Sequence, residues 1–286
     1  MKSAKINKII KFSNVDGPGN RMAIFFQGCN LDCIYCHNPE TIGICKECGE
    51  CVKECPTKAL KMMDNNIHWN NIQCIECDNC IGICKNNSSP KTKNYSVEEL
   101  INEVAKIKDF IQGVTVSGGE ATLNSDFLTL FFNQIKILFP TLTCFVDTNG
   151  YIDLADLSLK TFVKATDSFM LDIKSFSKEE HLELTGKNNE IILKNAEYLL
   201  DSNKLFEVRT VIAPEILGSL ITIKKVGNII KKTNKKVRYK LIKYREFGVR
   251  KDKIKCFTTP TDKEMEKLKT ELIQLENADN IEIIII

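Results

Sequence analysis

The sequence has no long apolar run and no strong excess of charge. No stretch approaches the roughly 20 residues that a membrane-spanning helix needs. The 286 residues carry 40 lysines and arginines against 37 aspartates and glutamates, and a net charge of +3 gives no basis for a nucleic-acid or membrane-surface partner. Near the start, Lys8, Lys11 and Asn14 interrupt the apolar positions that a secretory signal would need. These absences predict a cytoplasmic protein with no membrane partner and no nucleic-acid partner.

Cysteine, by contrast, is abundant. The chain has 13 cysteines, and in a reducing compartment many cysteines indicate metal or redox chemistry rather than disulfides. Cys144, on an expected interior strand, and Cys256 stand apart from the rest and are interpreted as inert thiols. The other cysteines form three groups, Cys29, Cys33, Cys36, then Cys45, Cys48, Cys51, Cys55, then Cys74, Cys77, Cys80, Cys84.

The second and third groups repeat one spacing, Cys-x2-Cys-x2-Cys-x3-Cys. Zinc sites usually split four ligands into two separated pairs, whereas a cysteine at every third residue suits a cubane iron–sulfur cluster. Two such runs are the signature of bacterial two-cluster ferredoxins, in which the fourth cysteine of each run ligates the other cluster. Pro56 follows Cys55 as in that signature, but Lys85 follows Cys84. We expect one cluster on Cys45, Cys48, Cys51, Cys84 and another on Cys74, Cys77, Cys80, Cys55, with structural zinc as the alternative.

The remaining sequence alternates strands with helices, which favours a parallel α/β sheet. Strands are expected at 22–27, 113–117, 142–147, 168–173, 205–212 and 236–242, and a short final strand at 281–286. Helices are expected at 96–110, 126–139, 177–184, 188–200, 216–231 and 261–276. Six βα units are too few for a closed eight-stranded barrel, so the prediction is an open partial (β/α)6 TIM-like barrel formed by residues 1–40 and 92–286. Residues 41–91, which are poor in large apolar side chains, are predicted to be an inserted ferredoxin-like domain held together by its metal clusters.

The first cysteine group supplies three thiolates and leaves one iron of a cubane open to a non-protein ligand. It follows directly after the first expected strand, and ligands of βα folds gather at the carboxyl ends of strands. Ser117-Gly118-Gly119-Glu120 follows the next expected strand. Its glycines allow close backbone approach to a ligand, and Glu120 can accept hydrogen bonds from an ammonium group. An ordinary strand-to-helix turn is the alternative for this segment.

The Cys29-x3-Cys33-x2-Cys36 spacing, with Tyr35 before the last cysteine, resembles the radical SAM superfamily. In that superfamily the open iron binds the amino and carboxylate groups of S-adenosylmethionine (SAM). The segments at 15–21, 35–39, 147–150 and 170–174 are similar to those of the glycyl radical enzyme activating enzymes. With the two-cluster insertion, the resemblance is to the YjjW-type glycine radical enzyme activases.

This resemblance implies roles for individual residues. Lys174 would reach the SAM carboxylate, and Arg209 would face the same cavity. Asp16 and His37 would lie near a docked substrate peptide. Arg245 stands where relatives commonly carry a histidine near the SAM ribose, which puts that contact in doubt. A monovalent cation beside the SAM carboxylate would be held by Asp147, Thr148, Met170 and Asp172, although a strand-end ion pair is the alternative for Asp172 and Lys174.

The resemblance also implies a reaction. The cofactors would be three [4Fe-4S] clusters, SAM and a monovalent cation, and a low-potential flavodoxin or ferredoxin would donate the electron. The product would be a 5′-deoxyadenosyl radical that removes a hydrogen from a glycine of a partner enzyme. Two alternatives remain open at this point, a radical SAM enzyme acting on a small molecule or on a peptide in another way, and a multi-cluster electron-transfer protein.

Overall fold

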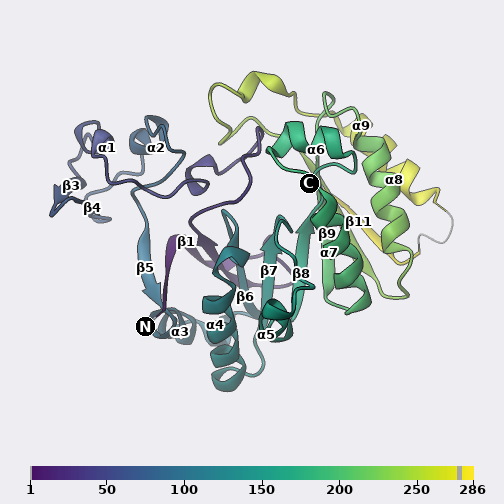
Figure 1. The fold of residues 1–286 in the computed structure, drawn as a ribbon, viewed down its shortest axis with the longest axis horizontal. Helices are drawn as coiled ribbons and strands as arrows, with labels where there is room; N and C mark the ends of the chain where they lie inside the picture. The colour runs from purple at the N-terminus through teal and green to yellow at the C-terminus, as the bar shows by residue number, and fades with distance from the viewer. Residues whose placement is uncertain (1, 276–278) are drawn as a thin grey trace.

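A computed structural model describes residues 2–275 and 279–286. Its centre is a nine-stranded sheet with the strand order β11-β10-β9-β8-β7-β6-β2-β1-β5 (Figure 1). Seven neighbouring strands, from β2 to β11 in that order, run parallel, and the sheet is open because β11 and β5 are its two edges. The parallel strands are β2 (Arg21–Phe26), β6 (Gly113–Gly118), β7 (Thr143–Thr148), β8 (Ser168–Asp172), β9 (Leu205–Ile212), β10 (Val237–Lys243) and β11 (Ile281–Ile285).

Helices follow these strands along the chain, which gives the six expected βα units and confirms the α/β architecture. Ser96 caps the first helix through a capping box with Glu99, but this helix ends at Ala105 and a 3-10 turn replaces its expected last part. The expected end of the last helix at Glu276 lies outside the described residues. The helices are α3 (Val97–Ala105), α4 (Ser125–Leu138), α5 (Lys160–Ala165), α6 (Lys178–Thr185), α7 (Glu190–Asp201), α8 (Ser219–Ile230) and α9 (Asp262–Ile273).

Two antiparallel strands at one edge were not anticipated from the sequence. Strand β1 (Ser3–Ser13) pairs with β2 on one side and with β5 (Lys93–Ser96) on the other. Ala4, Ile6 and Ser13 are buried, and the other residues of β1 are half-buried or exposed. Because one face of this strand is in contact with water, polar residues interrupt its apolar positions, and the sequence pattern did not indicate a strand.

The segment 41–91 leaves the sheet between β2 and β5 and lies to one side of it (Figure 1). Its two ends meet where the Gly43 amide donates to the Asn87 carbonyl at 2.8 Å. Its small apolar core includes Leu60, Ile67 and Trp69 together with three of the cysteines. The segment contains α1 (Glu50–Lys53), the hairpin β3 (Leu60–Met63) and β4 (Asn66–Trp69), and α2 (Asn79–Gly82).

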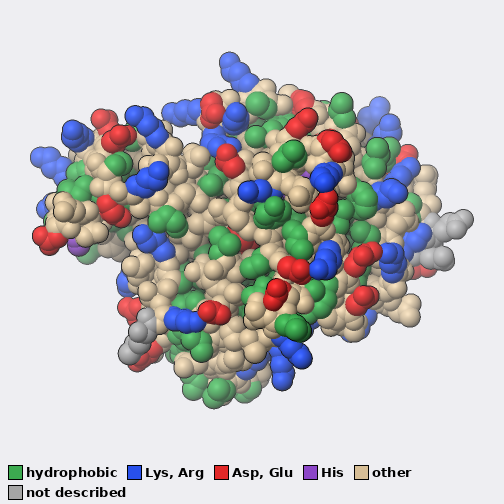
Figure 2. All heavy atoms as spheres, viewed as in Figure 1, with side chains coloured by type: hydrophobic (Ala, Val, Ile, Leu, Met, Phe, Trp, Pro, Cys, Tyr) green, Lys and Arg blue, Asp and Glu red, His purple; other side chains and the backbone are tan. Residues whose placement is uncertain are grey.

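The main core lies between the parallel strands and their helices. A second apolar cluster lies above the sheet and joins Tyr35, Tyr244 and Phe257, so the segment after β10 packs against the first cysteine group. Charged side chains of both signs are interspersed over the face drawn in Figure 2, in keeping with the low net charge. No described helix is both long enough and apolar enough to cross a membrane.

Candidate functional site

A cavity of about 210 Å³ lies at the carboxyl ends of the parallel strands. The cysteine loop after β2 and the glycine-rich turn after β6 form two of its walls. The ends of β7 and β8 form the rest, together with Lys174 and Val211. Two buried polar atoms at the cavity, the Tyr35 hydroxyl and His37 Nε2, have no partner in the part of the chain that the structure describes. The lining residues are Cys29, Leu31, Cys33, Tyr35, Cys36, His37, Asn38, Ser117, Gly118, Gly119, Glu120, Asp147, Thr148, Asn149, Asp172, Lys174 and Val211.

Backbone contacts hold the cysteine loop directly against the turn after β6. The amide of Gly119 donates to the Phe26 carbonyl at 2.9 Å, and the amide of Glu120 donates to the Gly28 carbonyl at 2.8 Å. A Cβ atom on Gly118 would lie 2.3 Å from the Phe26 nitrogen, and one on Gly119 would lie 2.2 Å from the Gly28 oxygen. Both positions therefore require glycine because two backbone segments touch there.

From the opposite side, Arg250 reaches the same cysteine loop. It forms an ion pair with Asp32 at 2.8 Å and donates to the Cys33 carbonyl at 3.3 Å. Gly248, with φ of 85°, allows its own backbone to pass close to the His37 carbonyl. The segment after β10 therefore closes over the loop. Arg245, in the same segment, is exposed and is absent from the lining of the cavity.

The three cysteines of the loop are neutral thiols when no metal is bound. Burial raises the pKa of Cys29 to about 12 and that of Cys36 to about 11, and burial also raises the pKa of Cys33. Within the described residues, no three His, Cys, Asp or Glu side chains converge as ligands of a single metal ion. Three thiols around one cavity do fit a larger polynuclear group, whose binding would release their protons.

The carboxylate of Glu120 joins the turn after β6 to the end of β7. Oε1 accepts from the Thr122 hydroxyl at 2.6 Å and from the Thr148 hydroxyl at 2.8 Å, and Oε2 accepts from the Asn149 amide at 2.7 Å. Burial raises the pKa of Glu120. Since a carboxylate offers about four lone-pair positions, Oε2 keeps capacity for a further donor at the cavity.

Asn149 is a residue for which the sequence suggested no role. Its Nδ2 lies 3.6 Å from the Cys29 sulfur and donates to Asn30 Oδ1 at 2.8 Å. The only signal was its place within the 147–150 segment. Its backbone N–H donates to Glu120, and its side-chain Oδ1 accepts from the Tyr151 amide at 2.8 Å. Backbone and side chain are both held in place, so Asn149 is a candidate positioning residue for the first cysteine group.

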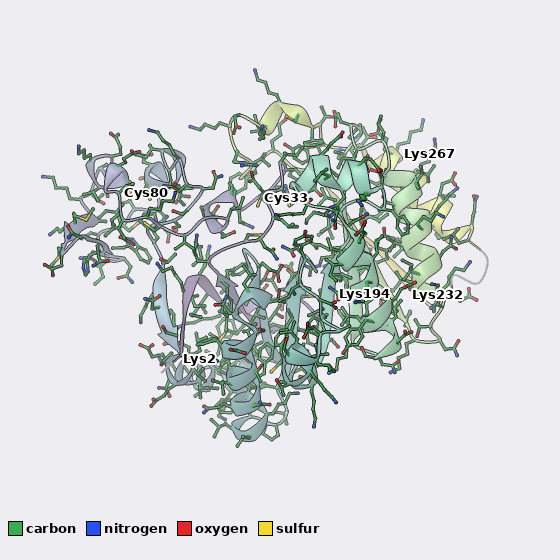
Figure 3. All side chains as sticks on the ribbon, viewed as in Figure 1. Lys2, Cys33, Cys80, Lys194, Lys232 and Lys267 are labelled. Carbon is green, nitrogen blue, oxygen red and sulfur yellow. The ribbon has the colours of Figure 1, made fainter. Side chains whose placement is uncertain are left out.

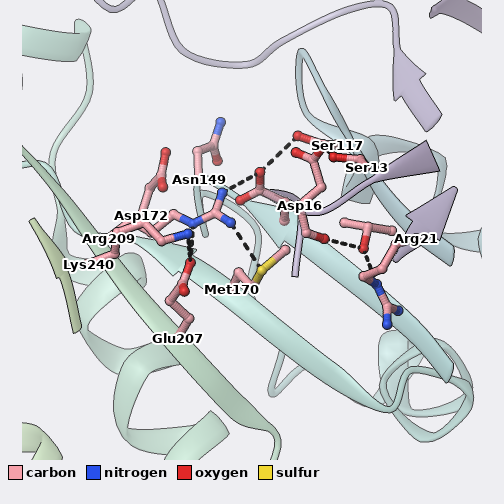
Figure 4. A network of polar contacts seen from close by, with 12 residues as sticks. Ser13, Asp16, Arg21, Ser117, Asn149, Met170, Asp172, Glu207, Arg209 and Lys240 are labelled. Atoms are coloured by element: carbon pink, nitrogen blue, oxygen red, sulfur yellow. Dashed lines mark hydrogen bonds and ion pairs between the residues drawn. The ribbon is translucent and has the colours of Figure 1, made fainter. Parts of the chain in front are cut away.

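A polar network lies at the edge of the cavity (Figure 4). The guanidinium of Arg209, on β9, donates to Asp147 Oδ2 at 2.7 Å and to Met170 Sδ at 3.1 Å. Lys174 pairs with Asp172 at 2.8 Å, and although burial lowers the pKa of this lysine, Asp172 and then Cys33 outweigh that effect and raise it. Asp16 accepts from the Ser13 hydroxyl at 2.5 Å and lies beside this network, outside the cavity lining.

The cysteines of the segment 41–91 line two further cavities, apart from the first group (Figure 3). In each cavity three cysteines of one run meet the fourth cysteine of the other run. One cavity contains Cys45, Cys48, Cys51 and Cys84, with Cys80 also on its wall. The other contains Cys74, Cys77, Cys80 and Cys55.

The backbone of the two runs repeats as the sequence does. Glu47 and Glu76 have φ of 55° and 54°, and Lys58 and Asn87 have φ of 54° and 45°. These are left-handed backbone conformations, which cost free energy for residues other than glycine. Alternating right- and left-handed residues turn successive amide groups inward, as at many anion and iron–sulfur sites. The donor set and the backbone of this segment therefore fit two cubane clusters.

Comparison with known proteins now bears on this geometry. Residues 23–218 match the radical SAM superfamily. The chain belongs to that superfamily. The matched span begins in β2 and includes the three-cysteine loop, the glycine-rich turn and the strand ends that line the main cavity. The superfamily is defined by a [4Fe-4S] cluster with SAM, and the buried thiols and unpartnered polar atoms described above fit such a pair.

Two relatives resemble this radical SAM protein over most of their length. The trans-4-hydroxy-L-proline dehydratase activating enzyme of Clostridioides difficile is 30% identical over 91% of this chain and 92% of its own. The pyruvate formate-lyase-activating enzyme of Staphylococcus epidermidis is 28% identical over 88% of this chain and 85% of its own.

Solved structures agree on the fold of this radical SAM protein. QueE from Escherichia coli superposes with a TM-score of 0.56 at 12% identity, covering 99% of this chain and 94% of its own. SuiB from Streptococcus suis bound to S-adenosylmethionine gives a TM-score of 0.58 at 14% identity, covering 91% of this chain and 48% of its own. At these identities the likeness concerns the fold alone.

Proposed function

We propose that this protein is a glycyl radical enzyme activase. The observation that carries the proposal is the cavity at the strand ends, where the three-cysteine loop, the glycine-rich turn, Asp172 and Lys174 meet in a chain whose full-length relatives are activating enzymes. A cubane held by the three cysteines would bind SAM and, after one-electron reduction, cleave the C5′–S bond of SAM into methionine and a 5′-deoxyadenosyl radical. That radical would take a hydrogen atom from a partner's glycine and leave as 5′-deoxyadenosine.

The residues of the cavity have defined tasks in this proposal. Cys29, Cys33 and Cys36 hold the cluster, and the backbone of Gly118 and Gly119 with the free capacity of Glu120 Oε2 receives the SAM amino group. Lys174 neutralises the SAM carboxylate, and its ammonium is kept charged by Asp172. The Tyr35 ring lies beside Lys174, with 5.9 Å between its centre and the Lys174 Nζ atom, and shields the site from water.

The segment 41–91 is proposed to hold two further [4Fe-4S] clusters with exchanged fourth ligands. The supporting observation is that each of its two cavities combines three cysteines of one run with the fourth cysteine of the other. These clusters would accept electrons from a low-potential flavodoxin or ferredoxin and pass them toward the main cavity.

The partner is proposed to be a glycyl radical enzyme whose glycine loop enters the open side of the sheet. Asp16 and His37 are proposed to contact that loop. His37 lines the cavity, and its Nε2 has no partner among the described residues. Asp16 lies beside the polar network at the edge of the cavity (Figure 4). A polypeptide substrate is compatible with an open sheet because a loop can reach the cavity without passing through a closed barrel.

An anaerobic assay tests this function. Reconstituted protein is mixed with SAM, a strong reductant and glycyl radical enzymes encoded near its gene, and 5′-deoxyadenosine and the EPR signal are measured. We expect 5′-deoxyadenosine together with a glycyl radical doublet on one partner. SAM cleavage without a radical on any partner would favour a small-molecule substrate, and absence of SAM cleavage would leave only electron transfer. A Lys174→Ala variant should bind SAM about tenfold or more weakly.

A further inference from the structure

Three carboxylates at the edge of the cavity pair with cationic side chains. Asp147, Asp172 and Glu207 are the carboxylates, and Arg209, Lys174 and Lys240 are the cations that pair with them. The distances of these pairs run from 2.6 Å for Arg209 with Glu207 to 3.0 Å for Lys240 with Glu207. Arg238 adds a further cation 3.6 Å from Glu207. Buried charges are stable only when they are paired, and each of these three carboxylates has a cationic side chain within 3.0 Å.

Arg209 has one position in this network because three groups hold it. Glu207, which is fully buried, accepts from Nε, while Asp147 and Met170 accept from the two terminal nitrogens. Figure 4 shows the guanidinium between Glu207 and Met170. A planar guanidinium held at all three nitrogens keeps its charge next to Asp147.

The resemblance assigns a monovalent cation to Asp147, Thr148, Met170 and Asp172. The side chain of each of these residues already has a hydrogen-bond or ion-pair partner. Asp147 accepts from Arg209 and from the Ser117 hydroxyl, and Asp172 accepts from Lys174. Thr148 donates to Glu120. Met170 offers a thioether, a soft ligand that suits a hard alkali cation poorly. Because the Arg209 guanidinium already lies 2.7 Å from Asp147, an alkali ion at the same carboxylate would be repelled by it, and these side chains therefore fit such an ion poorly.

We propose that the guanidinium of Arg209, anchored by Glu207, takes the place of the monovalent cation beside the SAM carboxylate. This inference rests on the proposed function, because it assigns Arg209 a positioning role toward SAM. Its consequence is that SAM binding by this protein does not depend on sodium or potassium ions.

The test compares reconstituted wild type with Arg209→Ala in buffers of one ionic strength whose only cation is potassium, sodium or choline. SAM affinity is measured by equilibrium dialysis, and the melting temperature is followed by circular dichroism. Wild type is expected to bind SAM equally well in all three buffers, within about twofold. Arg209→Ala leaves Asp147 unpaired and opens room for an ion, so its SAM affinity should be about tenfold higher in potassium than in choline.

Two further variants make the result decisive. Arg209→Lys keeps a positive charge beside Asp147, so its SAM affinity should be the same in potassium, sodium and choline. Arg238→Ala, which removes an arginine 3.6 Å from Glu207 but none of the contacts to Asp147, should do the same. Potassium should raise the melting temperature of Arg209→Ala but not that of wild type.

Three outcomes would overturn the inference. Wild type could lose SAM affinity in choline, Arg209→Ala could bind SAM equally in every buffer, or potassium could stabilise both proteins equally. Failure of the proposed function is a separate result, seen as no 5′-deoxyadenosine in any buffer, and the melting temperatures then decide whether Arg209 occupies a cation site.

Discussion

At the scale of single residues, the site depends on short polar contacts between segments distant in sequence. Asn149 is bonded through its backbone to Glu120 and through its side chain to Asn30, which brings its Nδ2 near the Cys29 sulfur. Hydrogen bonds to cluster sulfur stabilise the reduced state and raise the reduction potential. Asn149 is therefore placed to adjust the potential of a cluster on the first cysteine group.

Asn149→Ala is expected to lower that potential, by an amount on the order of tens of millivolts, because the donor to sulfur is lost. An EPR-monitored redox titration of the reconstituted protein measures this. Asn30→Ala is the control, since it removes a neighbour of Asn149 but no side-chain donor to Cys29, and its shift should be smaller. An unchanged potential in Asn149→Ala would show that the contact has no effect on the cluster.

At the scale of elements, the duplicated cysteine runs share one backbone. Helices α1 and α2 occupy equivalent places, and the Val52 and Ile81 amides donate to the carbonyls of Gly49 and Asp78 at 3.0 and 2.9 Å. The left-handed residues repeat as well, although most of them are not glycine. The repeat spacing was visible in the sequence, but the left-handed turns were not, because Glu47 and Glu76 carry no sequence signal for positive φ.

The equivalent residues Glu47 and Glu76 give a matched pair of substitutions. Glu76→Gly should stabilise the segment by about 0.5–1 kcal/mol, because glycine adopts the left-handed conformation without steric cost. Glu47→Gly should bring no such gain, because the Glu47 carboxylate accepts from the Ile67 amide at 2.6 Å and that bond would be lost.

The measurement for this pair is the guanidinium midpoint at which cluster absorbance disappears under anaerobic conditions. The midpoint should rise for Glu76→Gly and stay level or fall for Glu47→Gly. Equal changes in both variants would contradict the role assigned to the Ile67 contact.

At the scale of the whole molecule, the cysteines fall into spatially separate sets. The first group lines the cavity at the strand ends, the other two groups lie in the segment beside the sheet, and Cys144 is buried in β7 while Cys256 is exposed. If each set holds its own cubane, the reconstituted chain should carry about twelve irons.

Cys33→Ala is expected to reduce the iron content to about eight per chain, because two complete cubanes remain. SAM cleavage should be abolished, because the cluster on the first cysteine group is lost. Iron and acid-labile sulfide analysis of anaerobically reconstituted protein measures this. Cys256→Ala is the control and should keep the full iron content. Loss of nearly all iron from Cys33→Ala would mean that the three sites depend on one another for folding.

The sequence by itself determined the α/β order, the six βα units and the grouping of the cysteines. These follow from local spacing and apolar periodicity, which act over a few neighbouring residues. It did not reveal β1, because a half-buried strand interrupted by lysines lacks a strong apolar pattern.

Only the tertiary structure decided which side chains meet. Arg209 reaches Asp147 from 62 positions away, and Arg250 reaches the cysteine loop from the far end of the sheet. The strand register sets the first contact and the packing of the segment after β10 sets the second, and neither is encoded in local spacing. The resemblance implied a monovalent cation at Asp147, and strand register is what brings the Arg209 guanidinium within 2.7 Å of the same carboxylate.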